Sequence, residues 1–199
     1  MKMPHYLILF RFMLAPTIVS LALVLKGESR LVIVILMYLG LLSDIFDGII
    51  ARKQNIATEK LRRLDSQVDL IFWIAIALAT WIIFPSLIKA NRIGLLCILV
   101  MEGLCYLISI LKFGKETCTH AFLSKMWGIS LLIAFTALIG FNHAGLPFKI
   151  TVALGIISQA DVIAIILILP KWTHDIPSAY HAYLIRKNIP FKKNKLFNG

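Results

Sequence analysis

Four aspartates lie close together in the sequence, where a polar connection separates two hydrophobic segments. Asp44 and Asp47 end the first segment, and Asp65 and Asp69 begin the second. On a helix, residues three or four positions apart share one face, so each pair projects its carboxylates in one direction. If the two helices are antiparallel neighbours joined by the connection 52–63, all four carboxylates meet at a similar depth.

Carboxylates that cluster without counter-charge repel one another, and divalent cations relieve that repulsion. Carboxylate oxygens select hard metals, and this stretch contains no His or Cys that would favour zinc. Two ions about 3.5–4 Å apart would neutralise the cluster and bind phosphate oxygens. The alternative is that the aspartates lie at helix ends and pair with neighbouring arginines. We predict a two-metal site for Mg²⁺ or Mn²⁺ with the ligands Asp44, Asp47, Asp65 and Asp69.

Two residues beside the acids suit a phosphate ligand. Gly48 follows Asp47, and its missing side chain lets a ligand approach the helix backbone. Arg52 lies one turn later and offers a guanidinium that can form paired hydrogen bonds with a phosphate. The stretch therefore predicts phosphate chemistry at the end of a hydrophobic helix.

The composition indicates a membrane protein. Of 199 residues, 59% are hydrophobic, and the mean hydropathy is +0.85, whereas about 45–50% apolar residues is usual in soluble domains. The apolar runs do not alternate with polar residues, which excludes a β-barrel. We expect an all-α integral membrane protein with six transmembrane helices, near residues 7–25, 31–51, 64–84, 93–111, 127–142 and 150–169.

Basic residues predict the orientation. If both termini share one side, that side holds sixteen of the 21 Lys and Arg residues, so both termini and the aspartates are expected in the cytoplasm. The net charge of +11 suits anionic lipid rather than nucleic acid, since no basic stripe alternates with aromatic residues. We expect one domain over 1–185 and a basic, disordered tail over 186–199.

The aspartate stretch resembles the signature of the CDP-alcohol phosphotransferase family, D-x-x-D-G-x-x-A-R, eight residues, then G-x-x-x-D-x-x-x-D. Leu61 replaces the second glycine. The chain also opens like the family, with Pro4, Arg11 and Pro16, although His5 and Ile8 replace the usual Asn and Thr. Seven of the eight fixed positions of the signature match: Asp44, Asp47, Gly48, Ala51, Arg52, Asp65 and Asp69.

The resemblance implies a chemistry and a set of roles. An alcohol attacks the β-phosphate of a CDP-linked donor, usually CDP-diacylglycerol, and CMP leaves. Asp69 would act as general base on the hydroxyl and share a metal with the other three aspartates. The pocket for cytidine and phosphate would be lined by Gly48, Ala51 and Arg52. The family further implies a homodimer in a membrane, for which we expect the bacterial inner membrane.

The resemblance leaves the acceptor open among glycerol 3-phosphate, inositol phosphate, inositol, serine and another lipid's head group. Lys125 resembles a lysine that faces the site in family members, and Arg62 and Arg63 are further candidates for binding an acceptor. Arg11 would extend to lipid phosphate or contact a substrate phosphate. Leu61 is expected to fill space near the nucleotide, and three consequences stay open: a changed choice of donor or acceptor, a local shift of the helix, or an inactive protein.

Two acids lie in the middle of predicted spans. Charges there are costly, and we expect Glu102 and Asp161 to make polar contacts between helices. An ion-coupled transporter could use the same acids, but the four aspartates lie together instead of crossing the bilayer. A membrane prenyltransferase also binds pyrophosphate through metals, but it has two well-separated acidic motifs.

Overall fold

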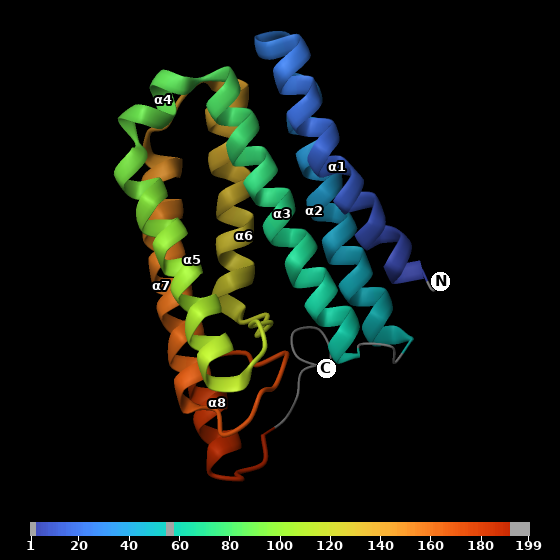
Figure 1. Ribbon diagram of the computed structural model, residues 1–199, viewed down its shortest axis with the longest axis vertical. Coiled ribbons are helices and arrows are strands. Elements are labelled where there is room, and N and C mark those ends of the chain that lie inside the picture. The colour runs from blue at the N-terminus through green and yellow to red at the C-terminus, as the bar shows by residue number, and fades with distance from the viewer. Residues whose placement is uncertain (1–2, 55–57, 192–199) are drawn as a thin grey trace. The chain divides into compact units, whose positions relative to one another are not determined.

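The structure is a computed structural model that describes residues 3–54 and 58–191 (Figure 1). Within these ranges every regular element is a helix, which confirms the predicted all-α class. The chain divides into two units. Unit 1 is Met1–Arg92 with Leu131–Phe148, and unit 2 is Ile93–Ser130 with Lys149–Gly199.

The long helices follow the apolar runs, because an apolar segment that avoids water satisfies its backbone hydrogen bonds within a helix. Three short elements, at Lys26–Ser29, Pro85–Ala90 and Ala179–Arg186, lie outside the apolar windows, so hydrophobicity does not predict them. The long helices are α1 (Met3–Leu25), α2 (Arg30–Lys53), α3 (Glu59–Ile83), α5 (Arg92–Phe113), α6 (Phe122–Phe135) and α7 (Leu146–Ile168). The short elements are η1 (Lys26–Ser29), α4 (Pro85–Ala90), η2 (Thr136–Gly140) and α8 (Ala179–Arg186).

Five segments of the described chain are long and apolar enough to cross a membrane, which supports a multi-pass membrane protein. The first of them, Met3–Lys53, contains 51 residues and holds both α1 and α2. These two helices pack against each other after the turn at η1 (Figure 1). The 51-residue segment is therefore folded back on itself, and each of the six predicted windows corresponds to one long helix, with η2 extending α6.

In unit 1, α1 packs along both α2 and α3, whereas α2 and α3 contact each other much less. The residues of α1 that face its partners recur at intervals of three and four, as a helix with one buried face requires. Helix α1 thus stands between the two helices that carry the aspartates. Its buried stripe includes Pro4, Ile8, Arg11, Ala15, Ile18 and Ala22.

One close approach between α2 and α3 depends on a glycine. A Cβ atom added at Gly40 would collide with the ring of Phe72, which is only 1% exposed and has little room to move. We expect Gly40→Ala to lower the free energy of unfolding by about 1–3 kcal/mol, the usual cost of overpacking. Thermal unfolding in detergent would measure it. Gly103→Ala is the matched control, since a Cβ at Gly103 meets no atom within 4 Å, and equal stability of the two variants would contradict the prediction.

The connection between α2 and α3 is shorter than the polar stretch 52–63 suggests, because α2 continues to Lys53 and α3 begins at Glu59. Thr58 caps α3 by accepting the Leu61 N–H at 3.3 Å. Residues 55–57 lie outside the described part of the chain. At the other end α8 stops at Arg186, and most of the predicted disordered tail, 192–199, also lies outside it.

In unit 2, hydrogen bonds to backbone carbonyl groups link segments that are distant in the sequence. Lys112 Nζ, in α5, donates to the carbonyls of Ile166, Leu167 and Leu169 at 2.7–2.9 Å, which satisfies the C-terminal end of α7. The segment before α6 and the segment before α8 are joined by backbone bonds, such as Ile176 N–H to the Thr119 carbonyl at 2.7 Å. Lys112 is thus engaged within the fold.

The two mid-helix acids join helices, as expected. Glu102 accepts a hydrogen bond from Gln159, which links α5 to α7. Asp161 Oδ1 accepts the backbone N–H of Ala179 at 3.0 Å, which links α7 to the start of α8. Both contacts lie within unit 2.

Candidate active site

The second half of α2 carries the first part of the site. Ser43, Asp47, Gly48 and Ala51 are buried and lie on one face of the helix, as the spacing predicts. In α3, Asp65 lies one turn after Leu61, and both are buried. The same local periodicity therefore brings one stripe of each helix into the interior of unit 1.

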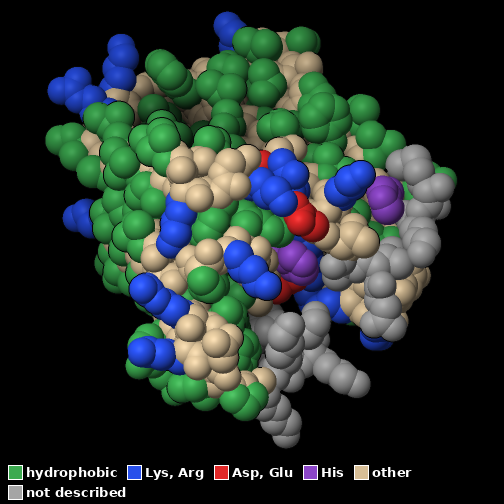
Figure 2. All heavy atoms as spheres, turned by 60° about the horizontal axis from the view of Figure 1, so that its bottom comes forward, with side chains coloured by type: hydrophobic (Ala, Val, Ile, Leu, Met, Phe, Trp, Pro, Cys, Tyr) green, Lys and Arg blue, Asp and Glu red, His purple; other side chains and the backbone are tan. Residues whose placement is uncertain are grey.

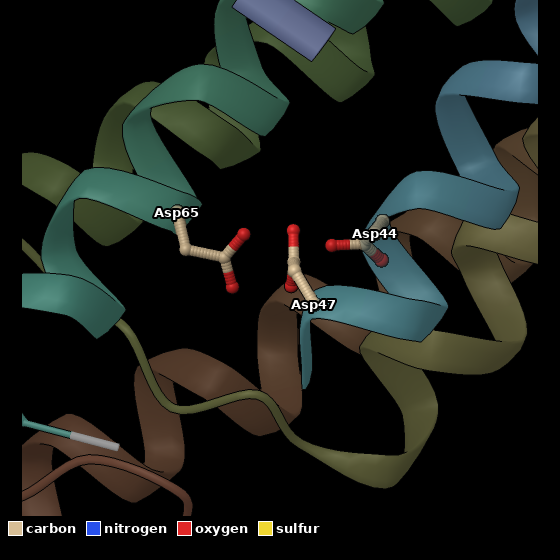
Figure 3. Close-up of side chains that lie close together, drawn as sticks. All are labelled: Asp44, Asp47 and Asp65. Carbon is tan, nitrogen blue, oxygen red and sulfur yellow. The ribbon is translucent and has the colours of Figure 1, made fainter. Parts of the chain in front are cut away.

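The carboxylates of Asp44, Asp47 and Asp65 point toward one another, with Asp47 between the other two (Figure 3). One oxygen from each lies within 4.8 Å of the others. Metal–oxygen distances of about 2.0–2.1 Å for Mg²⁺ allow oxygens on opposite sides of one ion to lie about 4.2 Å apart, so small side-chain movements would bring three oxygens at this separation around one ion. The donors are all hard oxygens, and the residues therefore fit a divalent metal of this class.

The four aspartates differ in access to solvent. The side chains of Asp47 and Asp65 are 3% and 5% exposed. Those of Asp44 and Asp69 are 33% and 30% exposed. Two carboxylates are thus held inside the helix packing, and two remain within reach of a ligand from outside.

Arg11 lies in the middle of the cluster, contrary to the expectation that it extends toward lipid. It is completely buried. Its Nη1 donates to Asp44 Oδ1 and lies 2.6 Å from Asp69 Oδ1. Its Nη2 lies 2.8 Å from Asp47 Oδ2 and 2.5 Å from Asp65 Oδ1. The guanidinium therefore bridges all four aspartates.

Sequence reasoning missed this role, although the sequence carries a signal for it. Arg11 falls on the buried stripe of α1, between Ile8 and Ala15 at intervals of three and four. A basic residue on a buried helix face needs acidic partners, and the four aspartates are the largest cluster of acids in the sequence. Combining the two observations would have predicted the contact.

Two guanidinium groups lie close to Gly48. A Cβ atom placed there would be 3.5 Å from Arg52 Nη1 and 4.0 Å from Arg62 Nη1. Arg62 is buried, at 3% exposure. The region beside Gly48 therefore brings two cationic groups within 4.0 Å of the place that a side chain would occupy, an arrangement that suits an anionic ligand. Figure 2 shows that Lys, Arg and acidic side chains all reach the surface on the face that it presents.

Leu61 is part of a small buried cluster. It is 5% exposed and belongs with Ile8, Ala51 and Val68, so it joins α1, α2 and α3. We expect Leu61→Ala to lower the free energy of unfolding by about 2 kcal/mol or more through the lost contacts and the cavity. Chemical or thermal unfolding of the purified variant would measure the loss. Leu64→Ala, on the exposed side of the same helix, is the control, and equal effects of the two would contradict a packing role for Leu61.

The remaining candidates are placed as follows. Arg63 lies 3.9 Å from Glu59, one turn away on α3. Lys125 lies in α6 and belongs to unit 2, whereas the aspartates belong to unit 1. The roles of these two residues in binding an acceptor remain predictions.

Comparisons with known proteins identify related sequences. Residues 1–175 match the family described as CDP-alcohol phosphatidyltransferase. Two curated proteins named CDP-diacylglycerol–glycerol-3-phosphate 3-phosphatidyltransferase, from Rickettsia typhi (strain ATCC VR-144 / Wilmington) and Rickettsia prowazekii (strain Madrid E), are each 27% identical over 141 residues. The match covers 66% of this chain and 76% and 75% of the two relatives. No solved structure matches the chain.

Proposed function

The chain belongs to the CDP-alcohol phosphatidyltransferase family, and from this premise we propose that its donor is CDP-diacylglycerol and its acceptor is glycerol 3-phosphate. It is an enzyme that transfers a phosphatidyl group to an alcohol in phospholipid synthesis. The proposed substrates are those named for the two relatives.

The observation that carries the proposal is the carboxylate cluster beside Gly48. Asp44, Asp47 and Asp65 would hold divalent ions, and Asp69 would share one of them. We propose Mg²⁺ or Mn²⁺, in a pair, since hard oxygens are the only donors in the cluster. When bound, the ions neutralise charge on the phosphates of the donor.

The exposed fractions support a division of labour among the aspartates. The base must meet a hydroxyl group that arrives from outside, and Asp44 and Asp69 are 33% and 30% exposed whereas Asp65 is buried. The choice of Asp69 over Asp44 follows the family resemblance. Asp69 would accept the hydroxyl proton as the acceptor oxygen bonds to the β-phosphorus of the donor. The bond from that phosphorus to the bridging oxygen breaks at the same centre, and the bridging oxygen leaves with CMP. Phosphoryl transfer depends mainly on such positioning and charge neutralisation.

The groups around Gly48 would bind the donor. Gly48 has no side chain, and Arg52 and Arg62 bring two positive charges beside it. These would orient the phosphates of the donor. Ala51 would line the nucleotide pocket, and Leu61, which packs against Ala51, would narrow it on that side.

The choice of glycerol 3-phosphate adds a second phosphate to the site. A doubly charged acceptor requires cationic contacts beyond those to the donor. Arg62, Arg63 and Lys125 are the proposed contacts. Lys112, by contrast, is occupied by three carbonyl groups at the end of α7, so we assign it no contact with substrate.

We further propose the arrangement in the membrane. All six long helices would cross the bilayer, with both termini and the aspartates in the cytoplasm, because sixteen of 21 basic residues then lie on that side. The membrane would be the bacterial inner membrane. A homodimer is proposed from the family alone.

The test is CMP release by the purified protein in detergent, supplied with CDP-diacylglycerol and Mg²⁺ or Mn²⁺. Glycerol 3-phosphate, inositol phosphate, inositol and serine would be offered in parallel. We expect metal-dependent release with glycerol 3-phosphate and formation of the corresponding phosphatidyl lipid. Release with another acceptor instead would overturn the acceptor, and absence of release with every acceptor would overturn the proposed donor.

A further inference from the structure

The contacts of Arg11 account for all the hydrogen atoms on its two terminal nitrogens. Nη1 and Nη2 carry two N–H groups each, and each nitrogen contacts two of the four aspartates. Arg11 Nε is buried and has no hydrogen-bond partner among the described residues. The position of the guanidinium therefore satisfies the carboxylates through Nη1 and Nη2 but leaves the Nε–H group without an acceptor.

A divalent ion would need the same place. The oxygens available from Asp44, Asp47 and Asp65 lie within 4.8 Å of one another, and an ion must approach each to about 2.0–2.1 Å. Arg11 Nη2 already lies 2.5 Å from Asp65 and 2.8 Å from Asp47. The guanidinium and a metal ion held by these carboxylates cannot occupy this space together.

From this geometry we infer that Arg11 is the resident counter-ion of the carboxylate cluster, and that divalent ions displace its guanidinium when they bind. This inference rests on the metal site of the proposed function. It makes Arg11 a positioning residue that keeps the four aspartates together before the metal is present.

Charge and hydrogen bonding both favour the exchange. One guanidinium offsets one of four negative charges, whereas two divalent ions offset all four. Displacement also releases the buried Nε–H, whose missing partner is unfavourable. The long side chain of arginine has several rotamers through which it can leave. Only the fraction of the protein in which Arg11 has left the cluster can bind the metal, so the apparent metal affinity is lower than the intrinsic affinity by that fraction.

The experiment measures metal binding without catalysis. Wild type, Arg11→Met and Arg30→Met would be purified in detergent, stripped with a chelator, and titrated with Mn²⁺ while free Mn²⁺ is followed by electron paramagnetic resonance. Arg30 is the matched control because it is an exposed arginine that contacts the Gly27 carbonyl and the Phe84 ring, away from the aspartates.

We expect Arg11→Met to bind Mn²⁺ about tenfold or more tightly than wild type, since a competing state populated at about 90% or above is removed. Stripped Arg11→Met should melt at a lower temperature than stripped wild type, and Mn²⁺ should raise its melting temperature by a larger increment. A purely structural role for Arg11 would lower stability without tightening Mn²⁺ binding. Arg30→Met should match wild type.

Equal or weaker Mn²⁺ affinity in folded Arg11→Met overturns the inference, while CMP release by the wild type would leave the proposed function standing. If Arg11→Met does not fold, Arg11→Lys decides the question. An ammonium group keeps the charge but cannot bridge four carboxylates, so tighter Mn²⁺ binding supports displacement and unchanged binding overturns it. Failure of wild type and Arg30→Met to bind Mn²⁺ overturns both the inference and the proposed metal site.

Discussion

Replacing Asp69 with asparagine is expected to lower the rate of CMP release by about 10²–10⁴-fold, the usual contribution of a general base. Asparagine has nearly the same shape, so it preserves the packing of α3, but it cannot accept the proton of the acceptor hydroxyl. The carboxylates of Asp44, Asp47 and Asp65 remain, and Mn²⁺ should still bind. Initial rates of CMP release with saturating donor and acceptor would measure the loss.

The control for this variant is Glu28→Gln, which removes an exposed carboxylate in η1 away from the aspartate cluster. It should release CMP at the wild-type rate. If Asp69→Asn retained a rate within about threefold of wild type, far less than a general base contributes, the base would have to be sought at another residue.

Asp47→Asn is expected to act through the metal instead. Asp47 lies between Asp44 and Asp65 and is almost fully buried (Figure 3), so its loss removes the central ligand. Changes in groups that merely support a metal ligand typically cost 10–100-fold in affinity, and we expect loss of this ligand to weaken Mn²⁺ binding by at least about that factor. CMP release at low Mn²⁺ should fall in parallel.

The activities of Asp47→Asn and Asp69→Asn should respond differently to a higher Mn²⁺ concentration. High Mn²⁺ should restore part of the activity of Asp47→Asn, because its defect lies in occupancy of the site. High Mn²⁺ should not restore the activity of Asp69→Asn, because asparagine cannot accept the proton even when the metal site is fully occupied. The same response of both variants to Mn²⁺ would contradict the division of roles between Asp47 and Asp69.

The spacing of the aspartates was sufficient to predict their convergence. Asp44 and Asp47, like Asp65 and Asp69, lie one helical turn apart, and uninterrupted apolar runs specify helices. Local periodicity therefore fixed which side of α2 and α3 carries the acids. The prediction did not need to know which helix separates them.

The arrangement of α1 could not be obtained in this way. Helices α2 and α3 are consecutive, but α1 packs along both of them more extensively than they pack on each other. Which helices become neighbours depends on how small and large residues fit between them, as Gly40 fits against Phe72. The position of Arg11 follows from that packing, and for this reason the expectation that it contacts lipid was wrong.

The periodicity of the sequence also did not predict the short helix α8 or the packing of Leu61, the residue that departs from the signature. Helix α8 lies outside the apolar windows, and its start is joined to α7 by Asp161. Leu61 was expected to fill space near the nucleotide, and the structure places it in a cluster with Ala51 and Ile8. Its effect on the choice of substrate remains a prediction.

The burial of Arg11 among four aspartates has a consequence for how the protein is made. A charged side chain within a membrane helix is unfavourable, by about 2.5–3.5 kcal/mol at the helix centre on insertion scales and by less toward the ends, and α1, α2 and α3 each carry at least one charged group of this cluster. During synthesis α1 and α2 emerge first, with one arginine set against two aspartates, and Asp65 and Asp69 follow on α3. Arg11 meets all four aspartates only when the three helices are packed together, so we expect the assembly of these helices to be sensitive to mutation of Arg11.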